Sequence, residues 1–83
     1  MTVTCAGDAA EILRRWGAAV RNRRRALGLS QVELAEAAGL RQSTISGIEL
    51  GVDQPTLTTR LQLAAALNVG HDDLFRVDGG EAA

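Results

Sequence analysis

Side chains suited to hydrogen bonding are concentrated between residues 41 and 47, where an arginine and a glutamine precede two serines. The amide of Gln42 donates and accepts in one plane, whereas the guanidinium of Arg41 only donates. The hydroxyls of Ser43 and Ser46 do either. Such side chains recognise the polar edge of another molecule, but they do not form the nucleophile–base pair that covalent catalysis requires.

Two short predicted helices, over about residues 31–38 and 42–49, position this polar row. Apolar residues at helical spacing form one cluster where the helices cross. The cluster consists of Leu34, Ala38, Leu40, Ile45 and Ile48. Ala35 lets the helices come close, and Gly39 lies in the turn, where a positive φ costs glycine nothing. This is the form of a helix-turn-helix unit. An ordinary helical hairpin would explain the cluster but not the outward polar row.

The segments LGLSQVELAEAAGL and STISGIELG resemble the lambda-repressor/Cro-like helix-turn-helix regulators, also called the xenobiotic-response-element family. The residues that match the family motif are Gln31, Ala35, Gly39, Ile45 and Ile48. The resemblance extends from about Trp16 to Phe75. It implies an all-α fold, a compact bundle of about five helices, and a sequence-specific DNA-binding transcriptional regulator of repressor or controller type. The runs TISGIE and GVDQPTLT are similar to restriction–modification controller proteins.

The resemblance also assigns expected contacts to double-stranded DNA. The expected base-reading residues are Arg41, Gln42, Ser43, Ser46 and Gly47. The expected phosphate-binding residues are Gln31, Arg25, Thr44, Gln54 and Thr56. Gln42 suits a bidentate pair with adenine, and Arg41 suits a phosphate or a guanine but is a poor helix cap. Relatives often carry a long polar side chain where this chain has Gly47, so the glycine either brings the backbone to a base edge or leaves a gap.

A structural ion pair is implied between Arg24 and Glu49, which would lock the first helix to the reading helix. Arg23 departs from the family, where an apolar residue is usual. It either moves to the surface or lengthens the basic face of the first helix.

The first helix is expected over about residues 9–27, with Asp8 as its N-cap and Glu11 completing a capping-box-like pair. Its buried stripe consists of Leu13, Trp16, Val20 and Leu27. Gly28 ends this helix. Ser30 and Glu33 form the capping box of the next one.

A fourth helix is expected over about residues 56–67, with Leu57, Leu61, Ala64 and Leu67 facing inward. Arg60 stands where relatives often have leucine, so we expect altered packing or a surface contact there. A last short helix follows over about residues 71–75.

A homodimer is also expected, because relatives commonly use the region after the fourth helix as a two-fold interface. Val69, Leu74 and Phe75 form an apolar patch that suits such a contact. The alternative is that these three residues only close the core of the monomer.

The composition indicates one small domain of 83 residues, with an aliphatic core because the chain has one Phe, one Trp and no Tyr. We expect an arm over residues 1–8, a domain over residues 9–77 and a tail over residues 78–83. The net charge is −1, but residues 1–60 carry +2 and residues 61–83 carry −3. A basic front and an acidic rear would orient the domain on DNA; the alternative is a solvated charge distribution without polarity in space.

Enzyme, membrane and metal functions find no support in the sequence. There is no Cys-His or Ser-His arrangement, no glycine-rich phosphate loop before a helix, and no cofactor motif. His71, Asp72 and Asp73 are three adjacent residues, which make a poor metal site and a better helix start. With no long apolar run or signal peptide, and a single cysteine, Cys5, we expect a cytoplasmic, nucleoid-associated protein. The alternative function is an antitoxin or other protein-interaction module.

Overall fold

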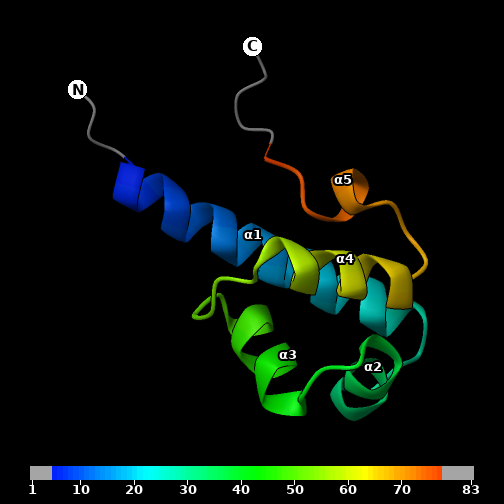
Figure 1. Ribbon diagram of the computed structural model, residues 1–83. Coiled ribbons are helices and arrows are strands. Elements are labelled where there is room, and N and C mark those ends of the chain that lie inside the picture. Colours follow the sequence, from blue (N-terminus) through cyan, green and yellow to red (C-terminus); the bar gives the residue numbers. More distant parts are fainter. Residues whose placement is uncertain (1–4, 78–83) are drawn as a thin grey trace.

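The computed structural model describes residues 5–77 (Figure 1). Its longest helix is α1 (Cys5–Ala26). Four shorter helices follow it within the described residues: α2 (Gln31–Ala38), α3 (Gln42–Leu50), α4 (Leu57–Ala66) and α5 (His71–Leu74). The all-α fold of about five helices is therefore confirmed. The bounds predicted for α2 and α3 agree with the structure to within one residue.

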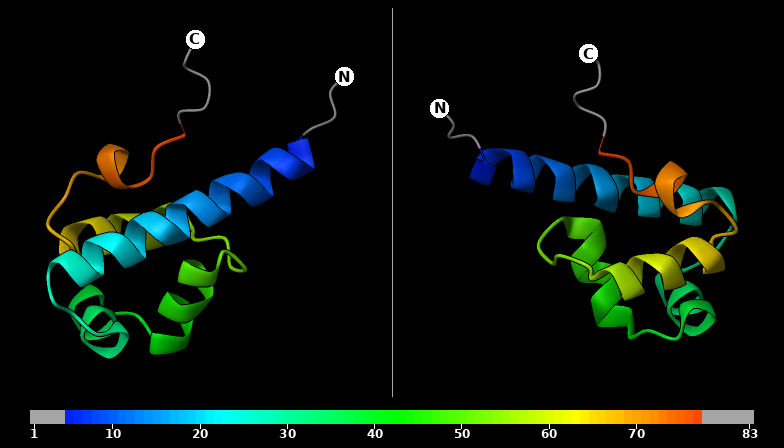
Figure 2. Two further views of the ribbon diagram at one scale, coloured as in Figure 1. Left: turned by 180° about the vertical axis from the view of Figure 1, so that it is seen from behind. Right: turned by 45° about the horizontal axis from the view of Figure 1, so that its top comes forward.

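The helices contact one another in a closed order that starts and ends at α1. Helix α3 contacts α1 and α2, α4 contacts α2 and α5, and α5 returns to α1. The N-terminal part of α1 extends beyond the other helices, and α5 lies on the opposite side of α1 and α4 from α2 and α3 (Figure 2). Of the helices between residues 5 and 77, not one combines the length and apolar character needed to cross a lipid bilayer.

Helix α1 begins earlier than predicted. Because it starts at Cys5, Asp8 lies within the helix, and the predicted cap at Asp8 is wrong. Glu11 instead accepts hydrogen bonds from the guanidinium groups of Arg14 and Arg15, at 2.7 and 3.2 Å. The first four residues of the predicted arm and the predicted tail over residues 78–83 lie outside the described residues.

The predicted buried stripe of α1 is wrong at its last residue, Leu27, because of the way the helix ends. Gly28 adopts a φ of 75°, its N–H donates to the carbonyl of Arg25, and the N–H of Leu29 donates to that of Arg24. This pair of bonds ends a helix and brings the next residue back onto it. Consequently Leu29 packs against the core, whereas Leu27 is 43% exposed.

The core is aliphatic, as the composition predicts. Its fully buried large side chains are Val20, Leu34, Ile45, Ile48, Leu63 and Leu67. Two of the four residues predicted to face inward on α4, Ala64 and Leu67, are buried, and Leu63 is buried beside them. The other two, Leu57 and Leu61, lie outside the core, with 56% and 50% of their surface exposed.

The close approach of α1 and α3 depends on Gly17, a residue that the sequence analysis did not single out. A Cβ atom on Gly17 would lie 2.7 Å from the carbonyl oxygen of Glu49, and it would also overlap the carbonyl of Ile48. Both obstacles are helix backbone, which cannot rotate away. Gly17 is therefore the position at which the two helices can touch.

We expect Gly17→Ala to lower the free energy of unfolding by about 1–3 kcal/mol, because it forces α3 away from α1. This holds even though alanine favours a helix over glycine by about 1 kcal/mol. Urea unfolding followed by circular dichroism measures the change. The matched control is Gly47→Ala, where the added methyl group meets only the side chain of Asp53. Equal stabilities for the two variants would contradict this account.

Candidate nucleic-acid interface

Helix α3 presents one polar side to solvent. It begins at Gln42, and Arg41 is an N-cap residue with extended backbone and no side-chain capping bond, as predicted. Arg41, Gln42 and Ser43 are exposed, and Ser46 is half-buried. The opposite side of α3, with Ile45 and Ile48, is buried in the core. Four of the five residues predicted to read bases are therefore accessible on one helix.

Local signals in the sequence fix the two ends of α2. The N–H of Glu33 donates to the Ser30 hydroxyl at 3.0 Å, and the N–H of Ser30 donates to the Glu33 carboxylate at 2.8 Å. This confirms the predicted capping box. Gly39 has a φ of 73°, as predicted for the turn, and the N–H of Leu40 donates to the carbonyl of Ala35 at 2.9 Å. The bond at the Gly39 turn ends α2 and directs the chain into α3.

A chain of hydrogen bonds joins α1, α2 and α3 behind the reading residues. Arg24 donates to both carboxylate oxygens of Glu49, at 2.7 and 3.0 Å, and also to the carbonyl of Leu29 at 2.8 Å. Gln31 donates to Glu49 at 3.1 Å, and Gln42 donates to Gln31 at 2.9 Å. Both Arg24 and Glu49 are buried. The pair implied by the family resemblance is therefore present, and it extends through Gln31 to the exposed amide of Gln42.

Glu49 is ionised within this chain. Burial works to raise the pKa of its carboxyl group, but hydrogen bonds from Arg24 and Gln31 outweigh that effect and lower the pKa. The same hydrogen bond from Arg24 to Glu49 raises the pKa of Arg24. Because an ionised carboxylate only accepts, Gln31 must turn its amide nitrogen toward Glu49 and its oxygen toward Gln42. Gln42 then directs its nitrogen toward Gln31, which leaves its own oxygen available to accept.

Gly47 departs from the prediction. It is buried, although it lies next to the exposed side of α3, because the carboxylate of Asp53 covers it. The N–H groups of Val52 and Asp53 both donate to the carbonyl of Gly47, at 3.0 and 3.2 Å. The backbone at Gly47 is therefore not open to a base edge, and no gap is left there. Asp53 was not among the predicted site residues.

The predicted phosphate-binding residues fall on four segments. Arg25 is exposed at the end of α1, Gln31 begins α2, and Thr44 is half-buried on α3. Thr56 is exposed, but its hydroxyl caps α4 by accepting from the N–H of Thr59 at 3.1 Å. Gln54 is exposed in the loop before α4.

Arg23, which lies outside this interface, stabilises the packing of α1 on α4. Arg23 donates to the carbonyls of Leu67 and Asn68, at 3.0 and 3.2 Å, at the C-terminal end of α4. A cation at this end is favourable because the helix dipole is negative there. Arg23 therefore joins α1 to α4 and neither moves freely on the surface nor extends a basic face.

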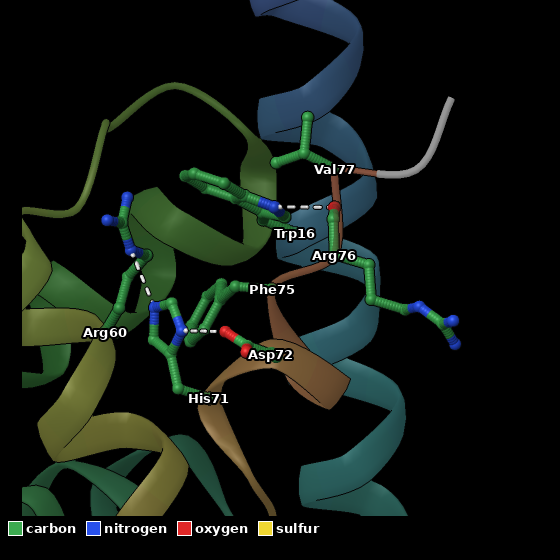
Figure 3. A pocket seen from close by; sticks show the side chains of 7 residues that line it. All are labelled: Trp16, Arg60, His71, Asp72, Phe75, Arg76 and Val77. Carbon is green, nitrogen blue, oxygen red and sulfur yellow. Dashed lines mark hydrogen bonds and ion pairs between the residues drawn. The ribbon is translucent and has the colours of Figure 1, made fainter. Parts of the chain in front are cut away.

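The far side of the protein carries an open cavity of about 500 Å³, lined by Trp16, Arg60, His71, Asp72, Phe75, Arg76 and Val77 (Figure 3). The Arg60 guanidinium lies 4.8 Å from the centre of the Trp16 ring. It donates to Nε2 of His71 at 3.2 Å, and Nδ1 of His71 lies 3.1 Å from the Asp72 carboxylate. Arg60 thus covers the core where leucine is usual. Within residues 9–77, whose side chains the structure describes, no three His, Cys, Asp or Glu side chains come together to hold a metal ion.

The predicted dimer patch is wrong for two of its three residues. Leu74 and Phe75 are 5% and 3% exposed, and the rings of Phe75 and Trp16 meet edge to face at 5.5 Å. They close the core of the monomer, which was the alternative left open by the sequence. Val69 is half-buried against the same core.

Comparisons with known proteins, by sequence and by structure, all find helix-turn-helix regulators. The helix-turn-helix family matches residues 20–74, from the C-terminal third of α1 to the end of α5. An uncharacterized HTH-type transcriptional regulator of Methanothermobacter thermautotrophicus is 40% identical over 60 residues, which are 71% of this chain and 87% of the relative. A regulator of the same description from Archaeoglobus fulgidus is 36% identical over 62 residues, which are 75% and 89% of the two chains. Both of these relatives are archaeal.

Solved structures give the same result. The restriction-modification controller protein C.AhdI of Aeromonas hydrophila has a TM-score of 0.74 and 40% identity over 76% of this chain and 96% of its own. The clp gene regulator ClgR of Corynebacterium glutamicum has a TM-score of 0.75 and 26% identity over 83% of this chain and 73% of its own. The chain therefore belongs to the lambda-repressor-like helix-turn-helix family of DNA-binding transcriptional regulators.

Proposed function

We propose that this regulator binds a two-fold operator with α3 in the major groove, and that it is a binding protein rather than an enzyme. The observation that carries the proposal is the hydrogen-bonded chain from Arg24 through Glu49 and Gln31 to Gln42. It holds an exposed amide in a fixed orientation on an outward helix face. An amide held in this way is suited to a bidentate pair with N6 and N7 of adenine.

Phosphate contacts would fix the register of α3 in the groove. Gln31 lies at the N-terminal end of α2, where free backbone N–H groups favour an anion, and Arg25 is exposed at the end of α1. We include Thr44, Gln54 and Thr56 in the same role. These contacts release counterions, so the affinity would fall steeply as the salt concentration rises.

A homodimer would place two copies of α3 in successive major grooves, about 34 Å apart. We assign the two-fold contact to Leu57 and Leu61, because they are half-exposed leucines one turn apart on α4. Leu74 and Phe75 cannot serve, since the monomer core already buries them. A core this small also gains from association. Such a protein would work in the cytoplasm, at the nucleoid.

Gel-shift titration tests the proposal with duplexes from the gene's own promoter region. We expect tight binding to a segment with two half-sites, and much weaker binding to either half-site alone. If no promoter segment binds and a neighbouring gene product co-purifies instead, the proposal fails in favour of a protein-interaction module.

Gln42→Ala is expected to reduce discrimination at one base pair of each half-site by about 1–3 kcal/mol, because the bidentate pair is lost. Stability should change little, since the side chain is exposed. Binding to matched and mismatched duplexes, measured by fluorescence anisotropy, gives the difference. Gln54→Ala is the control, because losing a phosphate contact weakens binding equally for all sequences. Unchanged discrimination in Gln42→Ala would show that another residue reads that base pair.

A further inference from the structure

Asp53 occupies the space that a side chain at position 47 would fill. A Cβ atom on Gly47 would overlap the Asp53 carboxylate, with the carboxyl carbon only 2.6 Å away. Residue 47 follows Ser43 by one helical turn and Ser46 by one residue, so its missing side chain belongs to the outward side of α3. The loop after α3 thus supplies a functional group at a position of the reading helix that has no side chain of its own.

The loop holds this carboxylate in place through its backbone. Gly51 adopts a φ of 77°, which turns the chain back along α3, and its N–H donates to the carbonyl of Ile48 at 3.0 Å. The N–H groups of Val52 and Asp53 then both donate to the carbonyl of Gly47. Asp53 is therefore anchored to the very residue that it covers, within one turn of the end of α3.

The charge of Asp53 is unbalanced where it stands. Among residues 9–77, whose side chains the structure describes, none pairs with its carboxylate by a hydrogen bond or ion pair. The other carboxylate of this region, Glu49, is buried and paired with Arg24. A free carboxylate beside a helix that enters a phosphate-lined groove is unfavourable unless a hydrogen-bond donor meets it there.

The major groove offers such a donor at cytosine. The N4 amino group of cytosine donates, and aspartate is one of the side chains that accept from it. Guanine presents N7 and O6, and thymine presents O4, all of which are acceptors that a carboxylate repels. Adenine has a donor at N6 but an acceptor beside it at N7.

We propose that Asp53 is a specificity-determining residue that accepts a hydrogen bond from the N4 amino group of a cytosine in each half-site. This rests on the proposed function, since it requires α3 to lie in the major groove. It is distinct from reading by Gln42, because Asp53 lies in the loop after α3 rather than on the helix, and because it reads a different base. The absence of a side chain at Gly47 is what admits the carboxylate to this position.

The test is selection of bound sequences from a pool of randomised DNA duplexes. We expect the wild-type protein to enrich a cytosine at one position of each half-site, with a preference of at least about fivefold. Asp53→Asn should lose this preference, because an amide donates as well as accepts and therefore tolerates other bases. Glu36→Gln removes one negative charge from an exposed position on α2 and should keep the wild-type preference.

Gly47→Ala gives a second, independent variant, because its methyl group displaces the carboxylate without changing the charge. It should lose the same cytosine preference while remaining folded, as circular dichroism would show. If the wild-type protein enriches an operator and Asp53→Asn selects the same bases at every position, the assignment of Asp53 is overturned. If the wild-type protein enriches no sequence at all, the proposed function itself is overturned, and this inference with it.

Discussion

Glu49→Ala is expected to lower the free energy of unfolding by about 3–5 kcal/mol, because it leaves the Arg24 guanidinium buried without its counterion. The loss would be larger than that of a surface ion pair, for which about 0–1 kcal/mol is typical. Thermal melts and urea unfolding measure it. Gln31 would also lose its acceptor, so the amide of Gln42 would no longer be held in one orientation. Discrimination between operators should fall together with stability.

A double variant distinguishes the cost of an unpaired buried charge from the cost of lost packing. Replacing the pair as a whole, by Arg24→Met with Glu49→Leu, removes the buried charge and should cost less than Glu49→Ala alone. Operator discrimination should stay poor in the double variant, since Gln31 still lacks its acceptor. If Glu49→Ala melts like the wild-type protein, the buried pair does not lock α1 to α3.

The same pair makes the free energy of unfolding depend on pH in the acid range. Because the folded-state pKa of Glu49 lies below its unfolded-state value, the unfolded chain binds the proton more tightly. The contribution is therefore complete above the unfolded-state pKa of this carboxyl group. It is lost as the pH falls through the lower, folded-state pKa. The wild-type protein should lose more stability over this acid range than the Glu49→Ala variant does.

Phe75→Ala is expected to lower the free energy of unfolding by about 3–5 kcal/mol, the usual cost of removing a buried aromatic ring. Phe75 is 3% exposed, and its ring meets the edge of Trp16, while Leu74 lies beside it in the core. The cavity that remains would be in the monomer, between α1 and the segment after α4. Trp16 is the only tryptophan, so its fluorescence reports directly on this site.

Protein concentration distinguishes a core residue from an interface residue. If Phe75 closes the monomer core, the loss of stability should be the same in dilute and concentrated solution. A loss that appears only at high concentration would restore Phe75 to a dimer contact. Leu57→Ala is the matched control, because Leu57 is 56% exposed and its truncation should change the monomer by no more than about 0.5 kcal/mol.

The sequence by itself determined the reading unit. The capping box of Ser30 and Glu33, the left-handed Gly39 and the spacing of Ile45 and Ile48 are local signals, and each acts within one or two helical turns. Residues this close in sequence meet in whatever tertiary structure the chain adopts. The bounds of α2 and α3, and the exposure of Gln42 and Ser43, therefore follow from the sequence. The Arg24–Glu49 pair spans 25 residues, and only the family resemblance implied it.

The tertiary structure decided which side of each outer element is buried. Leu57 and Leu61 fit one inward stripe with Ala64 and Leu67 by spacing. Only Ala64 and Leu67 are buried, and Leu63 takes the remaining place in the core. Periodicity identifies a helix, but its rotation is set by the partners it meets, which lie far away in sequence. Asp53 shows the same limit at the interface, because no spacing rule connects a loop carboxylate with Gly47. Their meeting depends on the turn at Gly51 and on three-dimensional space that only the folded chain defines.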